Sequence, residues 1–372
     1  MKKPFFRKTL LMAIWFLFIL GLLQAAGFIL FTFSDVRTIG SYGYPAGLYV
    51  YHPSLNFLYK PGFEGYFVGA GYRDIAFRIN SHGFPDDPFE PRSPRHRRII
   101  FLGDSVVFGS GVLEENRFTE QLQAEERMAE AGVEILNLGV NAYNFGHYLE
   151  LAKLRFMGLE PDLVVVGFTL NDIQKMEGLW PEKRLKPVKG QKKDLLRREW
   201  YSKPVWISRV QQSLGRTCAA RFVEQVVKTL KQKRMSEEDL KTYNTKWIRS
   251  AVRYWSEESN RDGLREKLQQ FREEVSRQGI PFVFLLFPEK NDLLHPGEYS
   301  LPRESTINLL VELHMDYCDA YGSFAAVPDI DSLYLVHDSV HFSQAGHSVI
   351  RDVILDCAVL GLIPGRLRND SK

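Results

Sequence analysis

The sequence predicts an α/β fold in which helices cover both faces of a parallel β-sheet. Two observations support this. From residue 98 onward, short apolar runs alternate with stretches of helical periodicity, and polar turn formers bound the apolar runs. Such alternation is typical of a parallel sheet with helical crossovers. At 372 residues and 45% hydrophobic content, the chain is long enough to bury a sizeable core.

Four strands are predicted in order, because each is an apolar run of strand length. They cover residues 98–103, 133–138, 161–168 and 281–287. Helices are predicted over residues 114–131, 145–157, 261–278, 301–321 and 344–360. The residues that directly follow each strand then share one edge of the sheet, where open α/β sheets bind ligands.

The N-terminal region, residues 1–34, predicts a membrane anchor. Four basic residues precede an uncharged stretch from Thr9 to Phe33. A helix of this length exceeds the roughly 30 Å of a bilayer's hydrocarbon core. Ala25 and Ala26 form a poor cleavage site, which favours an uncleaved anchor over a cleaved signal peptide. The basic flank then stays in the cytoplasm, and the rest of the chain is extracytoplasmic, most simply periplasmic.

Three further parts follow the anchor. Residues 35–97 are rich in Tyr, Phe, Gly and Pro, with short β-like runs, and predict a small β-rich extension ending in a basic linker. Residues 98–365 carry the α/β pattern. Within them, residues 174–260 contain no apolar strand and predict a mainly helical insertion.

The insertion is strongly basic. Between Gln174 and Arg234, 17 Lys or Arg residues stand against 5 Asp or Glu residues. This excess is hidden in the formal net charge of +3, which by itself indicates no polyanionic partner. A solvated helical face, an acidic glycan or anionic lipid headgroups would each explain it. We expect no nucleic-acid partner, and the sequence does not predict an oligomeric state.

The cysteines and short motifs argue against metal and cofactor chemistry. Cys218, Cys318 and Cys357 are too few and too scattered for a disulfide framework or a zinc site. The chain also lacks CxxC and HExxH patterns and a Walker lysine. We therefore expect neither a bound metal nor a cofactor.

Chemistry-bearing residues follow the predicted strands. Strand 98–103 ends in Gly-Asp-Ser at Ser105, residues 137–144 follow the second strand, and Asn171 lies just after the third. Asp338 and His341 precede the last predicted helix. A serine hydroxyl is a weak nucleophile that needs a base, and an imidazole oriented by a carboxylate is such a base. This set of residues matches the needs of acyl transfer.

From about residue 98 to 360 the chain resembles the SGNH, or GDSL, hydrolases and esterases. The resemblance lies in Gly-Asp-Ser after the first strand, Asn-Asp after the third, and Asp-x-x-His near the end. It implies a flavodoxin-like three-layer sandwich. It also implies Ser105 as nucleophile, His341 as base, Asp338 as the orienting acid, and Asn171 as a donor to the oxyanion.

The chain departs from this family at two positions. The family usually has a glycine after the second strand whose N–H is an oxyanion donor, and Ala142 stands there. Gly139, three residues earlier, is the second choice. The family also usually has Gly-x-Asn-Asp, where this chain has Thr169 in place of the glycine. The backbone N–H of Ser105 completes the expected oxyanion donors.

The sequence therefore predicts a membrane-anchored, extracytoplasmic serine esterase. An α/β-hydrolase is disfavoured because Val107 replaces the last glycine of G-x-S-x-G. Two alternatives stay open: an O-acyltransferase acting on an envelope polysaccharide, and a non-catalytic envelope-assembly protein. The expected partner is an ester-bearing substrate, such as an acylated glycan or lipid.

Overall fold

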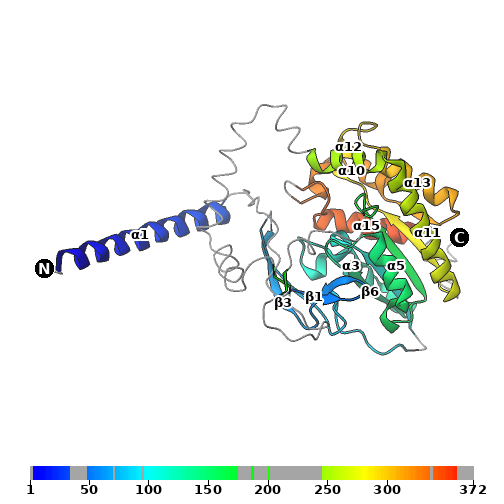
Figure 1. The fold of residues 1–372 in the computed structure, drawn as a ribbon, viewed down its shortest axis with the longest axis horizontal. Coiled ribbons are helices and arrows are strands. Elements are labelled where there is room, and N and C mark those ends of the chain that lie inside the picture. The colour runs from blue at the N-terminus through cyan, green and yellow to red at the C-terminus, as the bar shows by residue number, and fades with distance from the viewer. Residues whose placement is uncertain are drawn as a thin grey trace.

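A five-stranded parallel sheet forms the centre of the fold (Figure 1). The computed structural model describes residues 3–33, 48–69, 72–93, 96–174, 186–187, 200–201, 245–335 and 338–357. The sheet strands are β5 (Arg97–Gly103), β6 (Val133–Gly139), β7 (Leu163–Phe168), β10 (Phe282–Leu286) and β11 (Tyr317–Asp319).

The strand order is β11-β10-β7-β5-β6, and all neighbouring pairs are parallel. This is the flavodoxin-like order, in which the connection reverses direction between β5 and β7. The predicted α/β fold is confirmed. The prediction missed β11, whose three residues lie within a segment expected to be one helix, residues 301–321.

Helices cover both faces of the sheet (Figure 1). Residues alternate along β5, because successive strand side chains point to opposite faces. Ile100 packs in one core with α5 (Phe145–Lys153) and α11 (Glu258–Arg277). Phe101 packs in the other with α3 (Phe118–Gln123) and α15 (Gln344–Asp356). Both cores are buried.

Several predicted helices are shorter or broken in the structure. The stretch 114–131 forms η1 (Glu114–Asn116), α3 and α4 (Glu126–Glu130), because Arg117 and Glu125 adopt extended backbone. The buried Arg117 guanidinium donates to the Pro85 carbonyl over 2.7 Å. The stretch 145–157 ends its α-helix at Lys153, beyond which the chain turns left-handed at residues 155–157.

The remaining helical elements of the described residues follow here in chain order. They are α2 (Ser105–Phe108), η2 (Arg155–Gly158), α10 (Lys246–Ser256), α12 (Lys290–Leu294), α13 (Leu301–Glu312), α14 (Tyr321–Ala325) and η4 (Ile330–Leu333).

The N-terminal extension contains two antiparallel pairs of strands. β1 (Tyr49–His52) pairs with β2 (Asn56–Tyr59), and β3 (Glu64–Gly69) pairs with β4 (Tyr72–Arg78). Their buried aromatic residues belong to the same core as one face of the main sheet. The extension therefore packs directly on the α/β unit.

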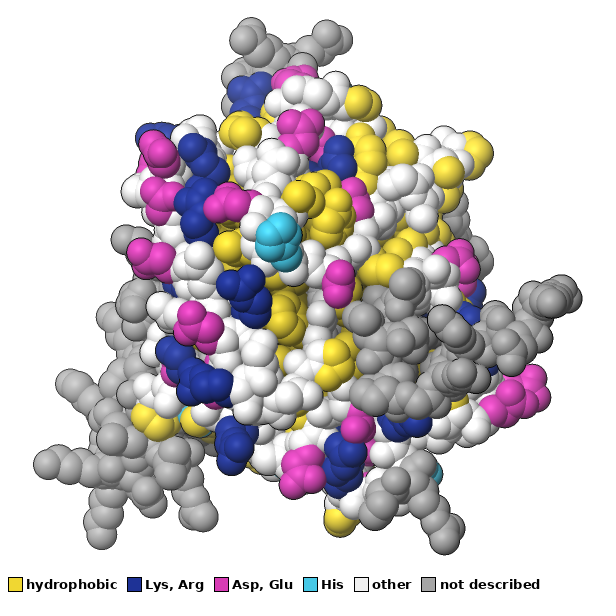
Figure 2. All heavy atoms as spheres, turned by 90° about the vertical axis from the view of Figure 1, so that its right-hand side faces the viewer, with side chains coloured by type: hydrophobic (Ala, Val, Ile, Leu, Met, Phe, Trp, Pro, Cys, Tyr) yellow, Lys and Arg dark blue, Asp and Glu magenta, His cyan; other side chains and the backbone are white. Residues whose placement is uncertain are grey.

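Only part of the predicted insertion lies among the described residues. β8 (Lys186–Pro187) and β9 (Trp200–Tyr201) form a two-stranded antiparallel pair, and α10 follows. The rest of the basic stretch lies outside the described residues, so its function stays a prediction. On the face drawn in Figure 2, Lys and Arg side chains lie among Asp and Glu side chains.

The N-terminal helix α1 (Lys3–Phe33) covers the predicted anchor segment. Within the described residues, no helix combines the length and apolar character needed to cross a bilayer. The expected transmembrane anchor is therefore not supported.

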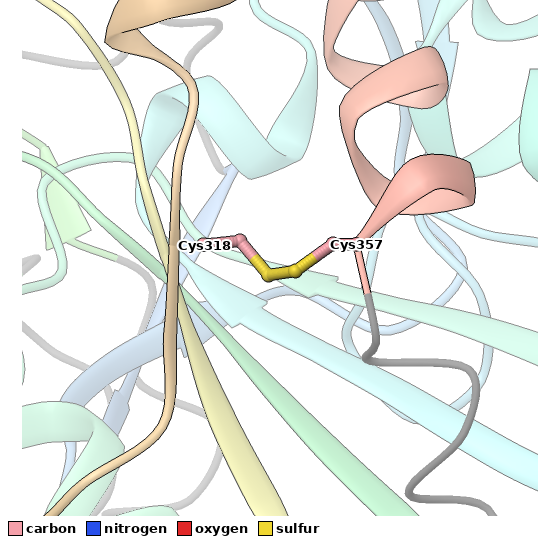
Figure 3. Close-up of a disulfide and its surroundings, with 2 residues drawn as sticks. All are labelled: Cys318 and Cys357. Atoms are coloured by element: carbon pink, nitrogen blue, oxygen red, sulfur yellow. A yellow bond between two sulfur atoms is a disulfide. The ribbon is translucent and has the colours of Figure 1, made fainter.

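One disulfide, which the sequence analysis did not predict, joins Cys318 to Cys357 (Figure 3). Cys318 lies on the edge strand β11, and Cys357 directly follows α15. The two residues are 39 positions apart, with their Cα atoms 6.3 Å apart. The pair does not belong to any spaced cysteine motif, so only the fold brings the residues together.

Candidate functional site

Ser105 lies at the carboxyl end of β5, beside the point where the strand order reverses. It is the first residue of α2, and the Asp104 side chain caps this helix by accepting from the Val106 N–H over 2.9 Å. Gly103 allows the close approach of α2, since a Cβ there would lie 2.0 Å from a Val107 methyl group. The turn thus places the serine hydroxyl at the edge where parallel sheets bind ligands.

The structure brings Ser105, His341 and Asp338 together. His341 Nε2 lies 2.7 Å from Ser105 Oγ, and His341 Nδ1 lies 2.8 Å from Asp338 Oδ2. The other carboxylate oxygen, Oδ1, accepts from the backbone N–H groups of Val340 and His341 over 2.8 and 3.0 Å. Asp338 therefore fixes its own loop with one oxygen and the imidazole with the other.

Two opposing effects set the pKa of His341. Burial lowers it, but the charge of Asp338 and its hydrogen bond raise it, with a further contribution from Asp104. The pKa of His341 therefore lies above its ordinary value of 6.5. An imidazole in this setting is a stronger base toward the neighbouring hydroxyl.

Ala142 occupies a left-handed backbone conformation, with φ at 68°. This region favours glycine, which is the usual family residue at that position. Within the described part of the chain, no hydrogen bond engages the Ala142 N–H. In contrast, the Gly139 N–H donates to Asn137 Oδ1 over 2.9 Å. A Cβ at Gly139 would also lie 2.2 Å from the Phe108 nitrogen. Gly139 is thus a packing residue, and Ala142 is the better candidate donor.

The β-rich extension fixes the loop that carries Ala142. The Asn141 N–H donates to the Tyr59 hydroxyl over 2.8 Å, and the Tyr143 hydroxyl donates to the Phe57 carbonyl over 2.7 Å. All of these residues are buried. Sequence reasoning missed this role of the extension, because no motif marks either tyrosine.

Asn171 is part of a polar network around Thr169. Asn171 Oδ1 lies 2.9 Å from the Thr169 hydroxyl, which is also 3.0 Å from Asp104 Oδ2. The hydroxyl proton serves one acceptor at a time. Asp104 is buried, and burial raises the pKa of its carboxyl group. The threonine found in place of the family glycine therefore links the turn before Ser105 to the Asn171 amide.

Three further hydrogen bonds fix the Asn171 loop. Buried Asp172 accepts from the Thr169 N–H over 2.8 Å and from the Tyr148 hydroxyl over 3.0 Å. Burial, and then the charge of Asp104, raise the pKa of Asp172 well above its ordinary value. The Trp255 indole N–H on α10 donates to the Leu170 carbonyl over 2.7 Å. These groups stabilise the loop rather than face the serine.

His347 lies apart from this chemistry. It is buried on α15, and its Nδ1 accepts from the Phe118 N–H over 3.3 Å. Burial lowers the pKa of His347 to about 3. It stays neutral, and its ring stacks on that of Phe118.

The arrangement of these groups is chemically suited to acyl transfer. A hydroxyl, an imidazole and a carboxylate form one continuous hydrogen-bonded chain, which is the arrangement that activates a serine. The Ala142 N–H and the Asn171 amide come from the loops after β6 and β7, the two strands that flank β5. Donors placed in this way stabilise a developing oxyanion.

Comparisons with known proteins concern the fold. No family model matches the chain, and no curated protein matches its sequence. Among solved structures, TesA is similar with 10% identity and a TM-score of 0.39, over 70% of this chain and 96% of that one. A lipase/acylhydrolase from Enterococcus faecalis is similar with 12% identity and a TM-score of 0.40, over 73% of this chain and 99% of that one. A catalytic mutant of Axe2, an acetylxylan esterase from Geobacillus stearothermophilus, is similar with 15% identity and a TM-score of 0.39, over 75% of this chain and 100% of that one.

Proposed function

We propose that this protein is a serine hydrolase that cleaves ester bonds through an acyl-enzyme. The observation that supports this proposal is the continuous hydrogen-bonded series from Ser105 Oγ through His341 to Asp338, with contacts of 2.7 and 2.8 Å. A hydroxyl that only capped a turn would not need an imidazole oriented by a partly buried carboxylate.

The proposed reaction has two halves. Ser105 Oγ attacks the ester carbonyl carbon while its proton passes to His341 Nε2, and Asp338 stabilises the imidazolium. The N–H groups of Ser105 and Ala142 and the Asn171 amide hold the oxyanion. The C–O bond to the alcohol then breaks, and the alcohol leaves with the proton from His341. Water attacks the acyl-enzyme in the same way and releases the acid.

We also propose an extracytoplasmic location. The Cys318–Cys357 disulfide supports it, because structural disulfides form and persist in oxidising compartments and are rare in the cytosol. The disulfide supports this location independently of the N-terminal segment. Lysis of intact cells directly into denaturant that contains a thiol-alkylating reagent tests it: we expect Cys318 and Cys357 to stay unmodified unless a reductant is added first. Immediate alkylation of both under denaturing conditions would contradict it.

The experiment that tests the function uses the purified full-length chain. A fluorophosphonate probe should label the wild type and not Ser105→Ala, and p-nitrophenyl acetate should be hydrolysed by the wild type and not by Ser105→Ala. Ser348→Ala is the matched control, since its hydroxyl bonds within α15 and to Gln121, away from the site. It should label and hydrolyse normally. No labelling of folded wild type would instead favour a non-catalytic protein.

An acceptor series separates hydrolysis from acyl transfer. The same assay is run with and without oligosaccharides, and the products are analysed by mass spectrometry. Free acid in both arms supports the hydrolase. Quantitative transfer of the acyl group to a sugar hydroxyl would show instead that the protein is an O-acyltransferase that uses the same residues.

A further inference from the structure

A small cavity lies against the residues that form the candidate site. One wall consists of Thr169 and Leu170 from the loop after β7, and a second contains Phe287 and Glu289 after β10. Val340 forms a third wall, and Trp247, on α10, forms the fourth. The walls therefore come from four separate parts of the chain that meet at the carboxyl edge of the sheet.

Two of these walls adjoin the reacting groups. Leu170 directly precedes Asn171, whose amide is the candidate oxyanion donor. Val340 directly precedes His341, whose Nε2 lies 2.7 Å from Ser105 Oγ. An ester carbonyl attacked by Ser105 has its oxygen near Asn171, and its leaving group accepts a proton from His341. The residues that directly precede Asn171 and His341 thus line the cavity, which makes it the candidate place for the acyl substituent of the carbonyl carbon.

The cavity is small and mainly apolar. The volume in which the centre of a water-sized group can move is about 10 Å³. A volume of this size holds roughly one such group. Leu170, Trp247, Phe287 and Val340 present hydrocarbon to it. The Glu289 carboxyl is occupied elsewhere, since it accepts from both the backbone and the side chain of Asn291 and from the Asp292 N–H.

The Trp247 wall is fixed to the Asn171 loop. Trp255, on the same helix, donates its indole N–H to the Leu170 carbonyl over 2.7 Å. Ile248 and Ala251 of α10 form a buried cluster with Leu170, against which Trp247 packs. α10 cannot move away from the cavity without breaking these contacts, so the cavity has a set size.

We infer that this cavity accepts the methyl group of an acetyl ester and excludes longer acyl chains, with Trp247 and Val340 as the residues that set the limit. This inference rests on the proposed function. It assigns the substrate class: acetylated alcohols, cleaved to acetate and the free hydroxyl.

Chain-length selectivity tests the inference. We would measure kcat/KM of the full chain for p-nitrophenyl acetate, butyrate and octanoate. The wild type should prefer acetate over butyrate by at least about tenfold, since one methylene in a tight pocket changes kcat/KM by roughly 10–200-fold. Trp247→Ala should raise the butyrate-to-acetate ratio about tenfold or more. Val340→Ala, on another wall, should raise it in the same direction and serves if Trp247→Ala does not fold.

Tyr254→Ala is the matched control, because Tyr254 lies on the same helix but lines a different groove, between α5 and α11. It should leave the ratio unchanged. Equal or faster hydrolysis of octanoate by the wild type would overturn the inference. The inference would also be overturned if the butyrate-to-acetate ratio of kcat/KM in both Trp247→Ala and Val340→Ala equalled the ratio in Tyr254→Ala. Failure of the proposed function looks different: no ester is hydrolysed in a Ser105-dependent way, and the fluorophosphonate probe does not react.

Discussion

The Thr169 hydroxyl lies 2.9 Å from Asn171 Oδ1 and so orients the amide that is proposed to bind the oxyanion. The same hydroxyl lies 3.0 Å from Asp104 Oδ2, next to the proposed nucleophile. Thr169 is therefore a positioning residue that connects the loops after β5 and β7. The hydrolases that the sequence resembles usually have glycine at this position, and the threonine of this chain places a hydroxyl within hydrogen-bonding distance of both loops.

Thr169→Val keeps the shape of the side chain and removes its hydroxyl. We expect kcat to fall about three- to tenfold with little change in KM, because one hydrogen bond contributes about 0.5–1.5 kcal/mol. Thr169→Ser restores the hydroxyl and should restore kcat. Steady-state kinetics with p-nitrophenyl acetate checks this. A loss of thermal stability without any loss of kcat would show a merely structural role.

Asn171→Ala removes a proposed oxyanion donor. We expect kcat to fall about 10²–10³-fold, the usual effect of losing one such donor. The fold should persist, since Asp172 and Trp255 still hold the loop. Circular dichroism and kcat measured on the same preparation check this. An unchanged kcat would assign Asn171 to the turn alone.

Ser105→Ala and His341→Ala should each abolish most esterase activity, and the double variant should be little worse than either. Residues that act as one unit lose their function together, so their effects do not multiply. Residual rates of the three variants, corrected for spontaneous ester hydrolysis, provide the test. Two independent losses that multiply in the double variant would contradict a shared mechanism.

Ala142→Gly should keep kcat within about threefold. Glycine adopts a positive φ without strain, and this gain offsets its larger loss of chain entropy on folding, so stability should change by less than about 1 kcal/mol. Ala142→Val should lower kcat at least about tenfold, because β-branched residues are poorly accommodated at the observed φ of 68°. Equal kcat in all three proteins would indicate that this backbone N–H does not face the oxyanion.

The pH dependence should report His341. The base must be neutral to accept the serine proton, so kcat/KM should rise with pH through a midpoint above 6.5, the ordinary pKa of His341. Asp338→Asn removes the charge that raises this pKa and leaves the effect of burial. Its midpoint should move down, and kcat should fall about 10⁴-fold. A pH profile of kcat/KM for both proteins checks the sign, and an unmoved midpoint would contradict the assignment.

The sheet and the order of its main strands could be predicted because buried parallel strands are nearly continuous apolar runs. The proximity of Ser105, Asp338 and His341 could be predicted because Ser105 follows a strand and the other two precede the final helix. β11 was missed because its three residues lack a pattern of their own. The break at Arg117 depends on a buried guanidinium and the distant Pro85 carbonyl. The hydrogen bonds of Tyr59 and Thr169 likewise depend on packing between distant segments, which spacing along the chain does not encode.

The disulfide has a consequence for how the site is assembled. Cys318 and Cys357 close a covalent ring, and Asp338 and His341 both lie inside it, while Ser105 lies outside. The base and its orienting acid thus come from a closed ring, and the nucleophile comes from a separate strand that the ring must meet. Oxidation of the two thiols that close the ring of residues 318–357 would therefore limit the freedom of the general base before it reaches the serine.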